Sequence, residues 1–64
     1  MTIEHNFNSR VECNMVKAWI DENIGIEYEV TFEDDNQHGT IMVFDMEYEE
    51  FEEFKSYLHN NSFI

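Results

Sequence analysis

Apolar and polar residues alternate along two short segments, a pattern that is typical of strands with one buried face. Residues 2–7 alternate in this way and predict a short edge strand at the N-terminus. Residues 26–33 repeat the period of two, with β-branched and aromatic residues on the apolar side. Residues 40–44 are apolar almost throughout, and we interpret them as a strand covered on both faces. This third strand is therefore expected at the centre of the sheet.

A helical spacing of apolar residues follows the first strand. Ser9 and Glu12 have the S-x-x-E spacing of a capping box, which marks the start of a helix. Gly25 lies where a residue in the left-handed conformation would end this helix. We therefore predict a helix over residues 10–23. The apolar residues that recur on one side of it are Val11, Met15, Val16, Trp19 and Ile20.

A second helix is predicted at the C-terminus. Asp45 is placed to cap its first turn, and acidic residues in that turn suit the helix dipole. Asn60 or Asn61 is expected to end it. The residues expected on its buried stripe are Phe51, Phe54 and Leu58, flanked by Tyr48 and Tyr57.

These elements give the order β-α-β-β-α in a single α+β domain over residues 1–64. The polar loop 34–39 ends in glycine and suits a hairpin between the second and third strands. We expect a small two- or three-stranded antiparallel sheet packed against two helices. A chain of 64 residues buries only about 60% of its surface, and its aromatic content of 16% is high. A homodimer that hides the surplus apolar surface is expected.

Charge is the most unusual property of the sequence. The chain has fifteen Asp and Glu residues against three Lys and Arg, a net charge of −12. Residues 21–54 hold thirteen of the acids and no Lys or Arg. Disordered acidic chains are poor in aromatic residues, so this aromatic-rich chain is expected to fold. Phosphates and anionic membranes would repel it, and it lacks a transmembrane or signal segment, which indicates a cytoplasmic protein.

The carboxylates are spaced closely enough to resemble a phosphate backbone. On a strand, acids two residues apart lie roughly 6.6 Å from each other. On the last helix, acids between residues 47 and 53 give about one charge per 2 Å, against one per about 1.7 Å in duplex DNA. Each could accept a charge-assisted hydrogen bond from Arg or Lys of a partner. The residues predicted to contact that partner are Glu27, Glu29, Glu33, Asp34 and Asp35 of the hairpin, with Glu47, Glu49, Glu50, Glu52 and Glu53 of the helix.

In its composition and in its acid-dense segments 27–35 and 47–53, the chain resembles the phage-encoded DNA-mimic inhibitor proteins. The resemblance is to a class of proteins, and no sequence motif of a particular family supports it. It implies binding to a basic DNA-binding protein of a bacterial host, in the host cytoplasm. Such a target is a nucleoid-associated protein, a restriction or CRISPR nuclease, or a DNA-repair enzyme whose DNA site is occupied. The resemblance assigns no individual binding residue.

A calcium-binding loop is one alternative. The run D-x-N-x-H-G from Asp34 to Gly39 overlays the start of an EF-hand loop, with Asp45 at the twelfth position. His38 stands where an oxygen ligand is wanted, and Asp45 is shorter than the usual bidentate Glu. The same residues serve turn chemistry in a hairpin. No metal or other cofactor is therefore assigned.

An interaction module that binds through its aromatic residues is the other alternative. Its contact residues would be Trp19, Tyr48, Phe51, Phe54 and Tyr57, although aromatic stripes at helical spacing are usually core. An enzyme is not expected. No spacing joins Cys13 to a histidine as nucleophile and base, and the three histidines lack zinc-ligand spacing with this single cysteine.

Overall fold

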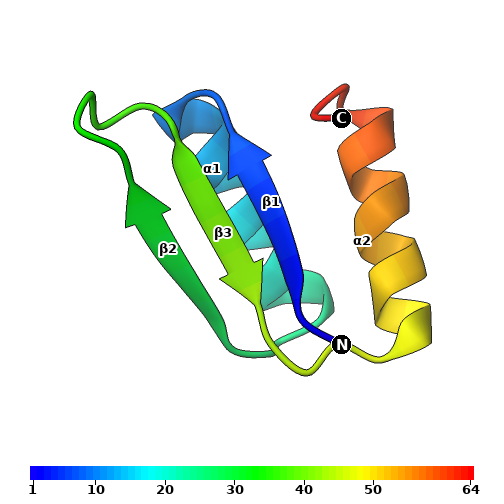
Figure 1. The fold of residues 1–64 in the computed structure, drawn as a ribbon. Coiled ribbons are helices and arrows are strands. Elements are labelled where there is room, and N and C mark those ends of the chain that lie inside the picture. The colour runs from blue at the N-terminus through cyan, green and yellow to red at the C-terminus, as the bar shows by residue number, and fades with distance from the viewer.

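A computed structural model describes residues 1–64, the whole chain, as a sheet with two helices (Figure 1). The elements in order are β1 (Ile3–Phe7), α1 (Arg10–Asn23), β2 (Tyr28–Phe32), β3 (Gly39–Val43) and α2 (Tyr48–Asn60). This order and the α+β class confirm the prediction. The sheet is antiparallel with strand order β1-β3-β2, so β3 is central and β1 is an edge strand, as expected. β2 is shorter than the predicted segment 26–33 and forms the other edge.

The core lies between one face of the sheet and both helices. Figure 1 shows α1 behind the sheet and α2 beside β1. Thr40 and Met42 of β3 point to the opposite face, where they are half-buried and no helix covers them. The expectation that both faces of this strand are covered is therefore wrong. The fully buried side chains come from both layers: Phe7, Ile41 and Val43 from the sheet, Cys13, Val16 and Ile20 from α1, and Phe54 from α2.

α1 begins and ends at the predicted residues, but its capping box is only half formed. The Ser9 Oγ accepts the N–H of Glu12 at 3.1 Å, as the spacing predicts. The Glu12 carboxylate accepts the N–H of Asn8 at 3.2 Å and contacts the His5 Nε2 at 2.7 Å, instead of bonding to Ser9. Gly25 adopts the predicted left-handed conformation, with φ of 69°.

The buried face of α1 is rotated from the predicted one. Val11 and Met15 were expected in the core but are 68% and 41% exposed. Apolar residues lie on two sides of this helix. Because Glu12 pairs with His5 in the interior, the side that carries Glu12, Val16 and Ile20 faces the core, and the side that carries Val11 and Met15 faces solvent. The buried residues of α1 are Glu12, Cys13, Val16 and Ile20, with Trp19 partly buried.

The N-cap of α2 lies two residues later in the chain than the predicted one. Its N-cap is Glu47, whose N–H donates to the Glu50 Oε1 at 2.9 Å. Asp45 has a left-handed φ of 55° and caps nothing. Between them Met46 is buried, and its N–H donates to the Met1 carbonyl at 2.8 Å. Anchoring Met46 in the core delays the helix, which then ends at Asn60 as predicted.

The hairpin loop turns at a different residue from the one expected. Gly39 was interpreted as the end of the loop, but it is the first residue of β3 and is buried. The left-handed conformation falls on Asn36 instead, with φ of 57°. The loop is closed by the Glu33 N–H, which donates to the His38 carbonyl at 2.8 Å.

Candidate functional site

Almost all of the carboxylates lie at the surface of this small domain. Glu12 is the only buried acid, and Glu50 and Glu52 are half-buried; the other twelve acids are exposed. Only one pairs with a Lys or Arg: the Glu52 Oε2 lies 3.5 Å from the Lys55 Nζ. The folded chain therefore carries its negative charge outward with almost no internal neutralisation.

The first group of acids lies on the open face of the sheet. Glu4 of β1 and Glu29 of β2 both pair with Met42 of β3, one from each side. Strands are spaced by about 4.8 Å, so these two glutamates lie about 10 Å apart across the face. With Thr31 and Thr40 they line a shallow hollow of about 270 Å³. Glu4 was missing from the predicted contact residues because only the strand register brings it beside Glu29.

Asp35 belongs to the hairpin loop and has a structural role there. Its carboxylate accepts the backbone N–H groups of Gln37 at 2.9 Å and His38 at 3.0 Å. It also contacts the His38 Nδ1. The bond from Gln37, followed by those from His38, lowers the pKa of Asp35 from 3.8 to about 2. Asp35 is thus firmly ionised, but much of its capacity to accept bonds is already used within the loop.

The remaining hairpin acids are free of such bonds. Glu27, Glu33 and Asp34 are exposed, and none makes a side-chain hydrogen bond or ion pair within the chain. Together with Glu29 they follow β2 and the loop at the sheet edge furthest from β1. These four carboxylates are exposed, and their role as contacts for a partner stays a prediction.

The second group of acids lies on α2. Glu49, Glu52 and Glu53 are spaced by three and four residues, so they share one side of the helix. That side is opposite the buried Phe54 and Leu58. Glu47 and Glu50 are engaged in the cap at the start of the helix. The outward acids of α2 are therefore a compact triplet.

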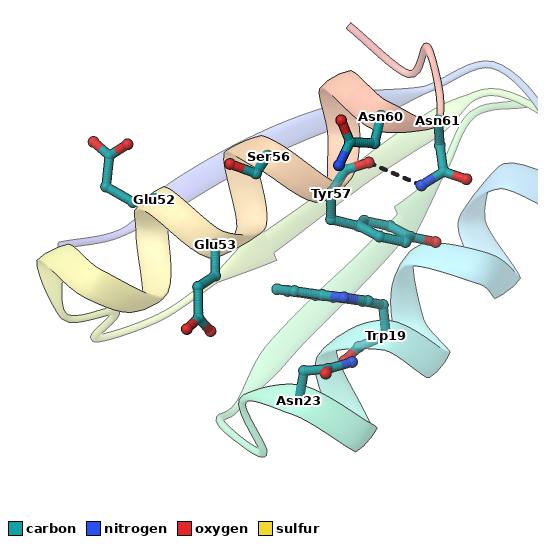
Figure 2. Close-up of a pocket in the computed structure, with 8 residues that line it drawn as sticks. All are labelled: Trp19, Asn23, Glu52, Glu53, Ser56, Tyr57, Asn60 and Asn61. Carbon is teal, nitrogen blue, oxygen red and sulfur yellow. Dashed lines mark hydrogen bonds between the residues drawn. The ribbon is translucent and has the colours of Figure 1, made fainter.

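A groove of about 560 Å³ lies between α1 and α2, beside this triplet (Figure 2). Trp19 stacks on Tyr57 there, with ring centroids 4.9 Å apart and planes 18° apart. Figure 2 shows Glu53 turned toward the α1 side of α2, whereas Glu52 points away from it. Burial raises the pKa of the Tyr57 hydroxyl, so this ring stays neutral. The groove thus combines an aromatic stack with an acidic rim.

The aromatic residues of the alternative interface do not form one exposed surface. Phe54 is buried against Trp19, with ring centroids 5.7 Å apart. Phe51 is half-buried and Lys55 lies over its ring, 5.2 Å from the centroid. Tyr48 is 67% exposed at the start of α2. Only Trp19 and Tyr57 reach the groove, and both already contact each other.

The calcium-loop alternative does not fit the observed geometry. Asp34 precedes β3 and Asp45 follows it, so the five-residue strand separates them by about 16 Å. Calcium ligands must all lie at 2.3–2.6 Å from one ion. No group of three or more His, Cys, Asp or Glu side chains is placed to hold a metal. The acids of this chain are spaced apart from one another instead of converging.

Cys13 is fully buried in the core, and its burial raises the pKa of its thiol. It is therefore protonated at neutral pH and lacks the thiolate that nucleophilic chemistry requires.

The fold and surface together define a small acidic α+β domain with two groups of solvent-facing carboxylates. No protein family, curated protein or solved structure was found to match this chain. Neither helix is long and apolar enough to cross a membrane.

Proposed function

We propose that this protein is a DNA mimic that inhibits a basic DNA-binding protein by occupying its DNA site. The observation that carries the proposal is that almost none of the surface carboxylates pairs with a Lys or Arg of the same chain. Fourteen of the fifteen acids lie wholly or partly at the surface, and one of them pairs with a Lys or Arg. A rigid array of carboxylates offers a basic cleft the same charge-assisted hydrogen bonds as a phosphate backbone.

The two groups of acids have spacings that suit this role. The outward acids on α2 are closely spaced, because Glu49 and Glu53 are separated by about 6 Å of helix rise, slightly more than one turn. Glu4 and Glu29 extend the charge across the sheet at about 10 Å. Arg and Lys side chains of a DNA-binding cleft could contact either surface. Binding would release counterions from both molecules, so affinity should fall steeply with salt.

On this proposal the partner is a DNA-binding protein of a bacterial host, met in the host cytoplasm. A nucleoid-associated protein, a restriction or CRISPR nuclease, and a DNA-repair enzyme all present a suitable basic site. The chain itself does not bind nucleic acid, because its charge of −12 repels phosphate.

A pull-down from bacterial lysate at low salt tests the proposal. We expect a basic protein to be captured, and to be released both by a salt step and by duplex DNA at constant salt. Release by DNA shows competition for one site. A captured partner that stays bound in high salt and in excess DNA would refute mimicry and favour contact through the aromatic groove.

A charge-reversal variant then locates the contact. Glu49→Lys, Glu52→Lys and Glu53→Lys are combined, because these side chains face outward and leave the core intact. We expect the captured partner to be lost while circular dichroism shows an unchanged fold. A second variant, with Glu4, Glu27 and Glu29 changed to Lys, makes the same change in net charge at the sheet and tests whether that surface also contacts the partner. Retention of the partner by both variants would contradict an electrostatic contact.

A further inference from the structure

α1 carries an apolar stripe on the side that faces away from the core. Its members, Val11, Met15 and Ala18, are exposed and are separated by four and three residues; Glu22 continues the same side of the helix four residues further on. This is the seam spacing of a coiled coil, in which two helices pack along one stripe. Val11 is the most exposed of the large apolar side chains of the chain, at 68%. The stripe has the spacing of a helix-pairing surface and is exposed in the single chain.

The same stripe is the least acidic part of the surface. From Ser9 to Ala18 the only acid is Glu12, which is buried against His5. Two of the three Lys and Arg residues, Arg10 and Lys17, lie beside the stripe. Two copies of a protein with a charge of −12 repel one another over most of their surfaces. They can approach along the first part of α1 without bringing carboxylates together.

The charges at the ends of α1 have signs that are unfavourable for a helix on its own. Arg10 lies at the positive end of the helix dipole, and Asp21 and Glu22 lie at the negative end. Each of these charges is unfavourable in an isolated helix. In an antiparallel pair, each lies beside the opposite end of the neighbouring helix, where its sign is favourable. Arg10 lies on the same flank of the stripe as Asp21, so a two-fold axis near Val16 brings the two together between copies.

We propose that α1 pairs antiparallel with α1 of a second copy of this chain, giving a two-fold homodimer. The apolar stripes form the seam, and Arg10 of each copy faces Asp21 and Glu22 of the other. The Arg10 guanidinium also lies over the Phe32 ring, 4.8 Å from its centroid, and its Nη1 donates to the Asn36 carbonyl at 3.3 Å. These contacts leave the guanidinium charged, with further N–H groups that can form the pair.

The expected dimer is weak. The paired segment is one helix of 14 residues, about 21 Å long, and it buries less area than a standard protein interface. Association should therefore depend on concentration and strengthen with moderate salt, because salt screens repulsion between the acidic surfaces. The open face of the sheet, with Glu4 and Glu29, is on the side away from the helices and remains exposed in the dimer.

Sedimentation equilibrium between about 10 μM and about 1 mM protein tests the pairing. We expect the mass of the natural chain to rise from 7.8 kDa toward twice that value. The variant with Val11→Glu and Met15→Glu should stay monomeric, with association weakened at least about tenfold. Both positions are exposed, so the fold is unaffected. The matched control, Tyr48→Glu, changes an equally exposed residue on α2 and should dimerise like the natural chain.

A natural chain that is monomeric throughout this range would overturn the inference, as would a dimer that the control disrupts and the stripe variant does not. A charge swap tests the antiparallel register separately. Arg10→Glu alone should weaken association, and Arg10→Glu with Asp21→Arg should restore it. If the double variant is as weak as the single one, the two residues do not face each other and the register is wrong.

Discussion

Substitution of Gly39 by alanine probes a close approach between the strands of the sheet. Gly39 lies in the central strand, opposite Phe7 of β1 and Phe32 of β2. A Cβ atom at this position would lie 2.1 Å from the Thr31 carbonyl oxygen and 2.5 Å from the Phe7 Cζ. Its φ is not in the left-handed region, unlike that of Gly25. The glycine is therefore required for space and not for backbone angle.

The cost of this substitution follows from the size of the overlap. Cβ atoms do not approach other heavy atoms closer than about 3.0 Å, so the Thr31 carbonyl must move by about 1 Å. Thr31 is part of β2, and moving it disturbs pairing with β3. Overpacking of a core costs 1–3 kcal/mol and more when backbone must shift, so we expect about 3 kcal/mol or more. A domain of this length has only about 3–10 kcal/mol of stability, so the variant is expected to be close to unfolding.

Urea unfolding followed by Trp19 fluorescence measures this cost, and Gly25→Ala supplies the matched control. No atom lies within 4 Å of a Cβ at Gly25, so only its φ of 69° opposes alanine. That penalty is about 1 kcal/mol. We therefore expect Gly39→Ala to be destabilised by at least about 2 kcal/mol more than Gly25→Ala. Equal destabilisation of the two variants would refute the close approach of the strands at this point.

Three further predictions concern the core, one loop and the net charge. Val16→Ala should lower the free energy of unfolding by about 2 kcal/mol, because Val16 is buried. Val11→Ala on the same helix should change it by less than about 0.5 kcal/mol, because Val11 is exposed. If urea unfolding shows similar losses for the two variants, the buried face of α1 is not the one that carries Val16. Asp35 has a depressed pKa, so its stabilising bonds are fully present above pH 3.8 and are lost as pH falls through about 2. Asp35→Ala should accordingly have a lower urea midpoint than the natural chain at pH 6, and a difference that persisted unchanged at pH 2 would show that ionisation of the carboxylate is irrelevant. Raising salt from low to moderate concentration should raise the melting temperature by screening self-repulsion, and an unchanged temperature would indicate that the acids are already neutralised.

Local signals were sufficient to predict most of the fold. Ser9 and Gly25 mark the two ends of α1, and alternation places the strands to within one or two residues. Signals of this kind depend on residues close together in the chain. The errors arise where distant residues decide. Only the pairing of Glu12 with His5 selects which apolar side of α1 is buried, and only burial of Met46 moves the start of α2 past Asp45.

The candidate site shows the same division. Exposure of the acids on α2 could be predicted from helical spacing, because Glu49, Glu52 and Glu53 lie opposite the aromatic stripe. The approach of Glu4 to Glu29 could not, because it depends on the register of both edge strands with β3. The hydrogen bonds that the Asp35 carboxylate accepts from Gln37 and His38 could not be predicted either. They depend on the conformation of the loop, which turn-forming residues alone do not specify.

The cost of the acidic surface is the strongest reason to assign it a role. Solubility is served by a net charge of about 2–8 on a small domain, and this chain carries −12. Glu49 repels Glu52 and Glu53 at neighbouring helical positions, which costs a few tenths of a kcal/mol for each pair. Interspersed lysines would relieve that repulsion, yet from residue 21 to residue 54 there are none. The basic residues are instead concentrated on α1, beside the apolar stripe. In the proposed dimer this separation gives one face on which two copies can meet, and in the proposed function it leaves the acids of the sheet and α2 for a positively charged partner.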